Sequence, residues 1–249
     1  MPRKQARRPR KAATPSASGL VVREVEDSDD AILSNAYQLL RREFDKHELV
    51  SVLEWRDTLA ERDAEVWSDV CWHIFVAERK GKILGVATGT YLGNVNIGAI
   101  GYLVVHPDAR GLGLGPRLRS RLKAALKRDA RRLRGKELAA VVGEVRRDNP
   151  WLRRLIRRDD VIALDFPYFQ PSLRRGQEPV PFVFYYEGVG KVRRTLEAKE
   201  LSRLLYTIWR RVYRVARPMT SEAFRRMVKD LAGRRVVREL PEPDDDGGG

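Results

Sequence analysis

The chain contains a single cysteine, Cys71, among its 249 residues. One thiol cannot form a disulfide within the chain, which excludes the disulfide-stapled class of small secreted proteins and fits a reducing compartment. Cys71 lies in the apolar run Val70-Cys71-Trp72, and this setting favours a buried structural thiol over a nucleophile. We therefore expect a cytoplasmic protein.

Long hydrophobic runs are absent as well. No apolar run approaches the roughly 18 residues that a membrane span needs. The basic N-terminus lacks the apolar segment of a secretory signal. Histidine is scarce, and His47 and His73 show no metal-ligand spacing with Cys71 or with each other. The sequence therefore predicts neither a membrane span nor a metal site.

Acidic residues are few relative to basic ones, 34 against 49, and the formal net charge is +15. Part of the excess lies in residues 1–19, which carry no acid and are rich in Pro, Ser and Ala, as is typical of a disordered tail. Such a tail can solubilise the protein, which we favour, or bind nucleic acid or an acidic partner. Residues 236–249 are acidic and then glycine-rich, and we expect a second disordered tail there.

Between the tails, the patterns alternate between strands and helices. Three strand patterns follow one another at 72–79, 83–92 and 96–105, and the short turns between them favour an antiparallel meander. The flanking patterns predict further strands at 20–24, 137–145, 166–169 and 181–186. They also predict four helices: one after an N-cap at Ser28, one within 49–61, one over 118–126 and one that begins at Asn149-Pro150.

Two further helical patterns follow residue 190. An apolar stripe from Leu201 to Val212 has helical spacing, Pro218 ends it, and Thr220 is the expected N-cap of a second helix that stops before Gly233. We expect residues 191–235 to form a helical extension packed on the core of residues 20–190. A dimerisation arm, or a basic amphipathic helix for a membrane surface or a partner, stays open.

The most informative stretch runs from Val105 to Gly115, between an apolar strand and an amphipathic helix. The first backbone N–H groups of a helix have no intrahelical partner, and with the helix dipole they suit a pyrophosphate. Gly111, Gly113 and Gly115 let the backbone approach such a ligand closely. Pro116-Arg117 excludes a P-loop, which needs Lys and Ser or Thr there, and the G-x-G-x-G order differs from a dinucleotide fingerprint.

This stretch resembles the acyl-CoA signature of the GNAT superfamily of N-acyltransferases, Q/R-x-x-G-x-G/A. The matching positions are Arg110, Gly113 and Gly115, preceded by the V-x-P-x-x-R-G spacing of Val105, Pro107, Arg110 and Gly111. The resemblance covers roughly residues 20–190. It implies an α/β fold with a mixed, mostly antiparallel sheet that splays open and is flanked by helices, to which the C-terminal helices are added.

The resemblance also implies acetyl-CoA as co-substrate. In the family, the thioester arm lies in the splay, here against Leu103, Val104 and Val105. The pyrophosphate would lie on Arg110, Gly111, Leu112, Gly113, Leu114 and Gly115. Asn149 fits the usual side-chain contact to the pantetheine arm, and capping of the following helix is an equally good interpretation.

The implied reaction is direct transfer of an acetyl group to a primary amine in a ternary complex. Many family members supply a tyrosine proton donor from the helix after the splay, but here that position is Leu155 or Ile156. Tyr168 is a substitute if it points into the cleft, and otherwise a half-buried strand aromatic. The usual acid is therefore absent from its usual place.

The remaining candidates are acidic. Glu144, at the end of a strand lining the splay, is the first candidate for the general base, and an ion pair with Arg146 or Arg147 is the alternative. Glu48 lies where the family builds its substrate loop and could bind a cationic amine, or it is a surface glutamate.

Three functions stay open at this point. The first is an N-acetyltransferase whose acceptor is a small-molecule or protein amine, with a homodimer not excluded. The second is a non-catalytic acyl-CoA-binding or regulatory module, suggested by the missing tyrosine. The third is a GNAT-fold protein that binds nucleic acid through the basic surface of the helix after the glycines.

Overall fold

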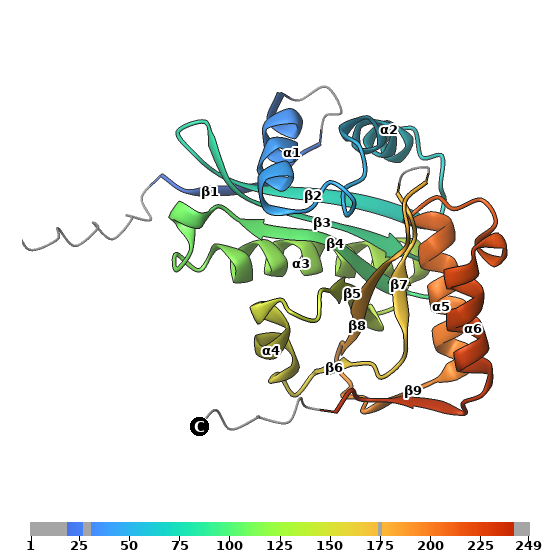
Figure 1. Ribbon diagram of the computed structural model, residues 1–249. Helices are drawn as coiled ribbons and strands as arrows, with labels where there is room; N and C mark the ends of the chain where they lie inside the picture. The colour runs from blue at the N-terminus through green and yellow to red at the C-terminus, as the bar shows by residue number, and fades with distance from the viewer. Residues whose placement is uncertain (1–18, 27–30, 174–175, 242–249) are drawn as a thin grey trace, which may run out of the picture.

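The computed structural model describes residues 19–26, 31–173 and 176–241 (Figure 1). Along the chain these residues form β1 (Val21–Glu24), α1 (Ala31–Glu43), α2 (Val52–Asp63), β2 (Val70–Arg79), β3 (Lys82–Leu92), β4 (Ile97–Val105), α3 (Leu114–Arg134), β5 (Ala140–Val145), α4 (Pro150–Ile156), β6 (Val161–Ala163), β7 (Tyr168–Gln170), β8 (Val180–Gly188), β9 (Thr195–Glu197), α5 (Ala198–Arg211), α6 (Glu222–Ala232) and β10 (Val236–Arg238).

One mixed, mostly antiparallel sheet forms the centre of the molecule. Its strand order is β1-β2-β3-β4-β5-β8-β6, and β7 also pairs with β8. The predicted meander of β2, β3 and β4 is confirmed. Helices α1 and α2 cover one face of this half of the sheet, and α3 covers the other (Figure 1). Both faces are covered, so β2 and β3 are buried almost throughout their length.

The sheet opens between β4 and β5. These strands pair in parallel only where Ile97–Ala99 lie beside residues 140–142, after which β4 continues to Val105 and β5 to Val145. Opposite Thr88, β4 carries an irregularity, because the register with β3 shifts there. A Cβ on Gly101 would lie 2.8 Å from Thr88 Oγ1, so only glycine fits this position without a shift. The backbone of the last part of β4 is therefore left without a neighbour on the β5 side.

The two C-terminal helices share a core with the second half of the sheet. Trp209 of α5 and Phe224 of α6 are fully buried, with ring centroids 4.9 Å apart. They belong to the same apolar cluster as Phe184 of β8 and Val142 of β5. Figure 1 shows α5 and α6 side by side at the edge of this half. The expected helical extension is thus packed on the core.

Several local predictions differ from the structure. Residues 236–241 do not belong to a tail, because Val236–Arg238 pair with β9 and Val237 is fully buried. Ser221, and not Thr220, is the N-cap of α6, while Gly233 follows its end as expected. Strands β6, β9 and β10 are too short to show a periodic pattern. The expected tails at 1–18 and 242–249 and the cap at Ser28 lie outside the described residues.

Among the helices that the structure describes, none is long and apolar enough to cross a membrane.

Candidate active site

A cleft of about 1080 Å³ occupies the opening between β4 and β5. Eight of the site residues expected from the sequence line it: Glu48, Leu103, Val104, Val105, Arg110, Gly115, Glu144 and Asn149. Leu112 and Leu114 pack instead with the apolar cluster between α3 and the sheet. The structure therefore brings most of the expected residues to one cavity.

The glycine turn leads directly into α3. Gly111 and Gly113 have φ angles of 84° and 69°, in the left-handed region that favours glycine, and open space surrounds the Cβ position of each. Gly113 is the N-cap, so α3 begins at Leu114 and Pro116 is its third residue. The first-turn amides of α3 have no carbonyl to bind within the helix, although Pro116 contributes none. This end of α3 is suited to an anion.

Arg110 extends from the turn across the mouth of the cleft. Its Nη2 donates to Glu43 Oε2 over 2.8 Å, and its Nε lies 3.4 Å from the carbonyl oxygen of Val105. The guanidinium thus links the end of α1 to the end of β4. Its side chain remains 62% exposed, so it stays accessible to a ligand at the glycine turn.

Cations from α3 and the α4–β6 loop line another part of the cleft. Arg119, Lys123 and Arg158 all bind the carboxylate of Glu187 on β8, which is 0% exposed. Although burial raises the pKa of Glu187, Arg119 and Lys123 outweigh it and hold that pKa below its usual value. The Nε of Arg119 is buried and has no hydrogen-bond partner among the described residues. Arg158 also pairs with Asp160, so three cations face two carboxylates and this wall keeps a positive charge.

Glu144 lies at the inner end of the cleft, near the end of β5. The Tyr168 hydroxyl donates to its Oε2 over 2.5 Å, and the Tyr213 hydroxyl donates to its Oε1. Burial raises the pKa of Glu144 to about 7, against the lowering effect of these two hydrogen bonds, and the charge of Glu48 adds to the rise. A carboxylate with this pKa can accept a proton near neutral pH.

The expected alternative for Glu144, an ion pair with Arg146, is not what the structure shows. Arg146 Nη1 donates to Glu48 Oε1 over 2.6 Å, and its Nε lies 3.6 Å from Asp148. Glu48 is thereby buried, with 6% of its surface exposed, and is not a surface glutamate. The carboxylate of Glu48 is thus paired with a cation, whereas the carboxylate of Glu144 accepts hydrogen bonds only from tyrosine hydroxyls among the described residues.

Tyr168 lies in the core. It is 1% exposed and packs against Phe166 and Phe184. Of the two alternatives given for Tyr168, the structure shows the strand aromatic, and more deeply buried than expected: β7 directs it into the core, where its hydroxyl reaches Glu144. At the position where the family has a tyrosine, Leu155 is buried against the cleft.

Asn149 caps α4. Its Oδ1 accepts a hydrogen bond from the amide of Trp151 over 2.9 Å. The residue also lines the cleft, so the contact to a pantetheine arm stays a prediction.

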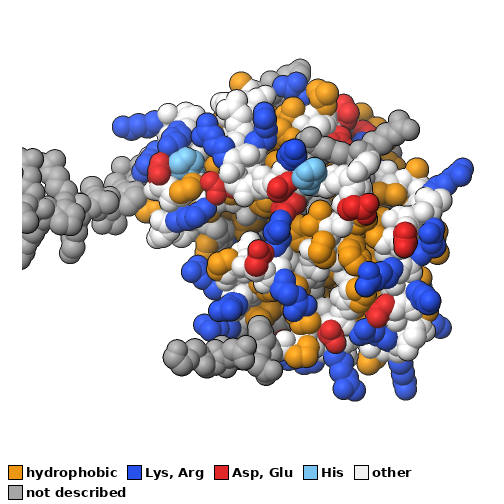
Figure 2. Space-filling view, in the orientation of Figure 1, with side chains coloured by type: hydrophobic (Ala, Val, Ile, Leu, Met, Phe, Trp, Pro, Cys, Tyr) orange, Lys and Arg blue, Asp and Glu red, His pale blue; other side chains and the backbone are white. Residues whose placement is uncertain are grey.

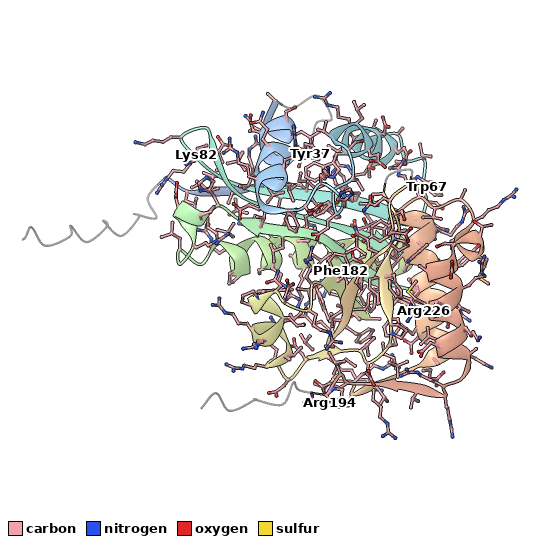
Figure 3. All side chains as sticks on the ribbon, in the orientation of Figure 1. Tyr37, Trp67, Lys82, Phe182, Arg194 and Arg226 are labelled. Atoms are coloured by element: carbon pink, nitrogen blue, oxygen red, sulfur yellow. The ribbon has the colours of Figure 1, made fainter. Side chains whose placement is uncertain are left out.

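Tyr213, which follows α5 and lies 69 positions from Glu144, was not predicted as a site residue. Its sequence signal is only the end of an amphipathic helix. Tyr185 of β8 was not predicted either; it lines the cleft, and burial raises its pKa to about 12. Phe182, also of β8, lines the cleft and lies near the centre of the molecule in Figure 3.

A second cavity of about 350 Å³ lies between α2, the meander and residues 210–216. Glu144 and Gly101 line both cavities. Trp67 lies at this cavity between the end of α2 and the C-terminal helices (Figure 3), and the Arg211 guanidinium is 5.6 Å from its ring centroid. The opening in the sheet is therefore reached from two sides.

A separate polar cluster lies under α3. The two ring nitrogens of His73 lie 2.5 Å from Glu24 Oε1 and from Asp129 Oδ2. Burial alone lowers the pKa of His73, but hydrogen bonds with Asp129, Cys71 and Glu24 outweigh it and raise the pKa to about 11. The ligand atoms of Cys71, His73 and Asp129 lie within 4.8 Å of one another. The sequence spacing did not reveal this group, and the expected absence of a metal stays a prediction.

The model of the acetyltransferase (GNAT) family matches residues 33–159 of the chain. The chain belongs to the GNAT acetyltransferase family. The matched residues contain β4, the glycine turn, α3, β5 and α4, which carry most of the residues that line the cleft. Membership supports acyltransferase activity in general. None of the curated proteins with which the chain was compared matches it.

Solved structures share the fold. A structure described as a GNAT-family acetyltransferase from Bacteroides thetaiotaomicron is 19% identical, with a TM-score of 0.56 over 78% of this chain and 99% of that one. One described as a probable acetyltransferase from Staphylococcus epidermidis is 14% identical, with a TM-score of 0.50 over 68% and 99%. The structure of yncA from Salmonella typhimurium with its cofactor acetyl-CoA is 19% identical, with a TM-score of 0.48 over 70% and 96%. At these identities the likeness shows the fold alone.

Proposed function

We propose that this GNAT acetyltransferase is an acetyl-CoA-dependent N-acetyltransferase that acts on a primary amine within a ternary complex. The observation that carries the proposal is the opening between β4 and β5, which leads from the glycine turn to Glu144. In this proposal, the glycine turn binds the activated acyl donor and Glu144 accepts a proton; Arg110 and Gly115 of the turn line the same cleft as Glu144.

The residues of the cleft fit acetyl-CoA. The cleft, at about 1080 Å³, is slightly larger than the usual small-molecule site of roughly 300–1,000 Å³, which suits an elongated ligand. The amides at the start of α3 and Arg110 would hold the pyrophosphate. The backbone of Leu103, Val104 and Val105, which pairs with β3 but not with β5, would hold the pantetheine arm. Arg119 and Lys123 supply positive charge for further phosphate.

Glu144 acts as the general base in this proposal. An amine is largely protonated at neutral pH and must lose a proton before its nitrogen can add to a carbonyl carbon. When bound, acetyl-CoA would supply the acetyl group as a thioester, and the new N–C bond would replace the C–S bond. The ammonium gives up two protons in all, and the second one, lost from the nitrogen after the N–C bond has formed, protonates the departing sulfur, so CoA leaves as a thiol. Glu144 takes up the first proton, the one that the ammonium loses before its nitrogen adds to the carbonyl carbon. Tyr168 and Tyr213 hold both of its oxygens in place.

The first experiment is a calorimetric titration of the full chain with acetyl-CoA and with CoA. Gly113→Trp places a large side chain where the pyrophosphate would lie and should abolish binding. Gly135→Trp is a matched control, because Gly135 has the same left-handed conformation and open surroundings at the other end of α3. Micromolar binding that only Gly113→Trp removes supports the proposal, and a folded parent that binds neither ligand at millimolar concentration refutes it.

The alternatives from the sequence are separated by further measurements. A non-catalytic module would bind acetyl-CoA but release no CoA with any amine. Nucleic-acid binding would fall steeply with salt. On the face drawn in Figure 2, acidic side chains lie among the basic ones over the whole surface, an arrangement that favours no continuous basic patch there. A homodimer and a cytoplasmic location stay predictions.

A further inference from the structure

The second cavity has walls from three separate parts of the chain. Aromatic side chains from α2, the loop after it, β2, β4 and the segment after α5 line it: Trp55, Trp67, Trp72, Tyr102 and Tyr213. The volume of about 350 Å³ lies at the small end of the range for ligand sites. These walls suit a small molecule with a flat apolar body.

Most charged groups of this cavity are matched by neighbours. Arg214 binds Glu61 over 2.9 Å, and Arg211 binds Asp69 over 2.5 Å. Arg210 donates to the carbonyl oxygen of Ala216 over 2.6 Å. Glu144, by contrast, meets only the hydroxyl groups of tyrosines within the part of the chain that the structure describes. The cavity is therefore most able to accept positive charge at Glu144.

Gln170 provides a second, independent indication of a ligand. The residue is 3% exposed and lines the cavity, and its Oε1 is buried without a hydrogen-bond partner among the described residues. A buried acceptor left unpaired costs free energy, so a donor from a ligand would be stabilising there. On β7, Gln170 lies two residues beyond Tyr168, whose hydroxyl binds Glu144. Alternate residues of a strand share a face and lie roughly 7 Å apart.

We propose that this second cavity binds the acceptor, a small primary amine on an aromatic body that carries a second hydrogen-bond donor at its far end. The amine lies at Glu144, the aromatic body lies between the aromatic walls, and the second donor binds Gln170 Oε1. Residues 210–216 of the C-terminal extension close the site, and Tyr213 positions Glu144 toward the amine. This inference rests on the proposed acetyltransferase function and adds the acceptor class to it.

The test uses two matched amines. Tyramine and phenethylamine share the aromatic ring and the ethylamine, and only tyramine carries a hydroxyl at the far end. We expect kcat/KM for tyramine to exceed that for phenethylamine by about tenfold or more. A ligand donor that pairs with one buried, otherwise unpaired acceptor usually improves binding by about this factor. Gln170→Leu should bring the ratio close to one by lowering the tyramine value, with phenethylamine little changed. A loss of structure would lower both values together.

A second variant keeps the test independent of Gln170. Val212→Trp fills the cavity from the C-terminal side and should abolish acetylation of both amines while calorimetric binding of acetyl-CoA persists. Val192→Trp is the control, because Val192 is half exposed and does not line the cavity.

The outcomes separate the two proposals. If the parent binds acetyl-CoA but acetylates neither amine, acetylates both equally, or acetylates only a peptide N-terminus such as that of Ser-Ala-Ala-Ala, the acceptor inference is wrong and the proposed function stands. If the parent binds no acetyl-CoA, the proposed function is wrong, and the inference fails with it.

Discussion

The sharpest prediction concerns Glu144→Gln. The buried environment raises the pKa of Glu144 from 4.5 to about 7, so the folded state binds this proton more tightly than the unfolded state does. Stability is therefore lost as the pH rises from below 4.5 to above 7, when the folded protein must carry a buried charge. Each pKa unit corresponds to about 1.4 kcal/mol, which gives an upper value of about 3 kcal/mol for the full penalty.

Gln has nearly the shape of Glu and carries no charge at any pH. At pH 5 only roughly a hundredth of Glu144 is ionised, so the comparison there is between two neutral side chains. At pH 8.5 nearly all of it is ionised, and Glu144→Gln should be more stable relative to the parent than at pH 5, by up to about 3 kcal/mol. The same variant should lose roughly 100-fold to 10,000-fold in turnover if Glu144 is the general base.

Urea unfolding of parent and variant at several pH values between 5 and 8.5 measures this difference. Glu137→Gln is the control, because Glu137 is exposed and pairs with Arg131 at the surface, so its difference should not grow at high pH. A stability difference for Glu144→Gln that stays constant with pH would refute the buried environment. If the stability difference grows with pH but the turnover of Glu144→Gln equals that of the parent, only the role of Glu144 as general base is refuted.

Three further predictions concern the surrounding structure. His73→Gln should destabilise the protein most near pH 6 and progressively less as the pH rises toward 11. The raised pKa of His73 adds stability that is fully present below pH 6.5 and disappears as the pH rises to about 11, where the folded protein loses this proton. Urea unfolding at several pH values across this range tests the prediction. Glu187→Gln should destabilise by about 3–5 kcal/mol, since three cations lose their only shared buried anion; a loss as small as that of an exposed ion pair would contradict this. Gly113→Ala and Gly135→Ala should each cost about 1–2 kcal/mol in thermal or chemical unfolding, because both have a left-handed backbone in open space; a much larger cost at one of them would mean that its surroundings are not open.

Local signals in the sequence were sufficient for the first half of the fold. Strands β2, β3 and β4 have long apolar runs and short turns, and the glycine turn between β4 and α3 has both a positional pattern and a conformational need for glycine. These features depend on residues that are neighbours along the chain, so periodicity and turn chemistry reveal them. The short strands β6, β9 and β10 have only three residues each, and no period can be read from so few.

The surroundings of Glu144 could not be predicted from the sequence. Its position at the end of a strand lining the splay identified it as a candidate base, but its sequence neighbours Arg146 and Arg147 suggested an ion pair instead. In the structure Arg146 is bound to Glu48, 98 positions away. Only the packing of distant segments decides which of two neighbouring charges is neutralised.

The sequence by itself predicted the meander and the glycine turn, because both follow from patterns within a few dozen residues. The fold class and the place of the cleft came from the resemblance of that turn to the GNAT signature. Tertiary structure alone decided the chemistry around Glu144. Tyr213 reaches it from the C-terminal extension, Tyr168 reaches it from β7, and burial changes its pKa. These effects depend on distance and desolvation, and a chain sequence records neither until distant segments have packed together.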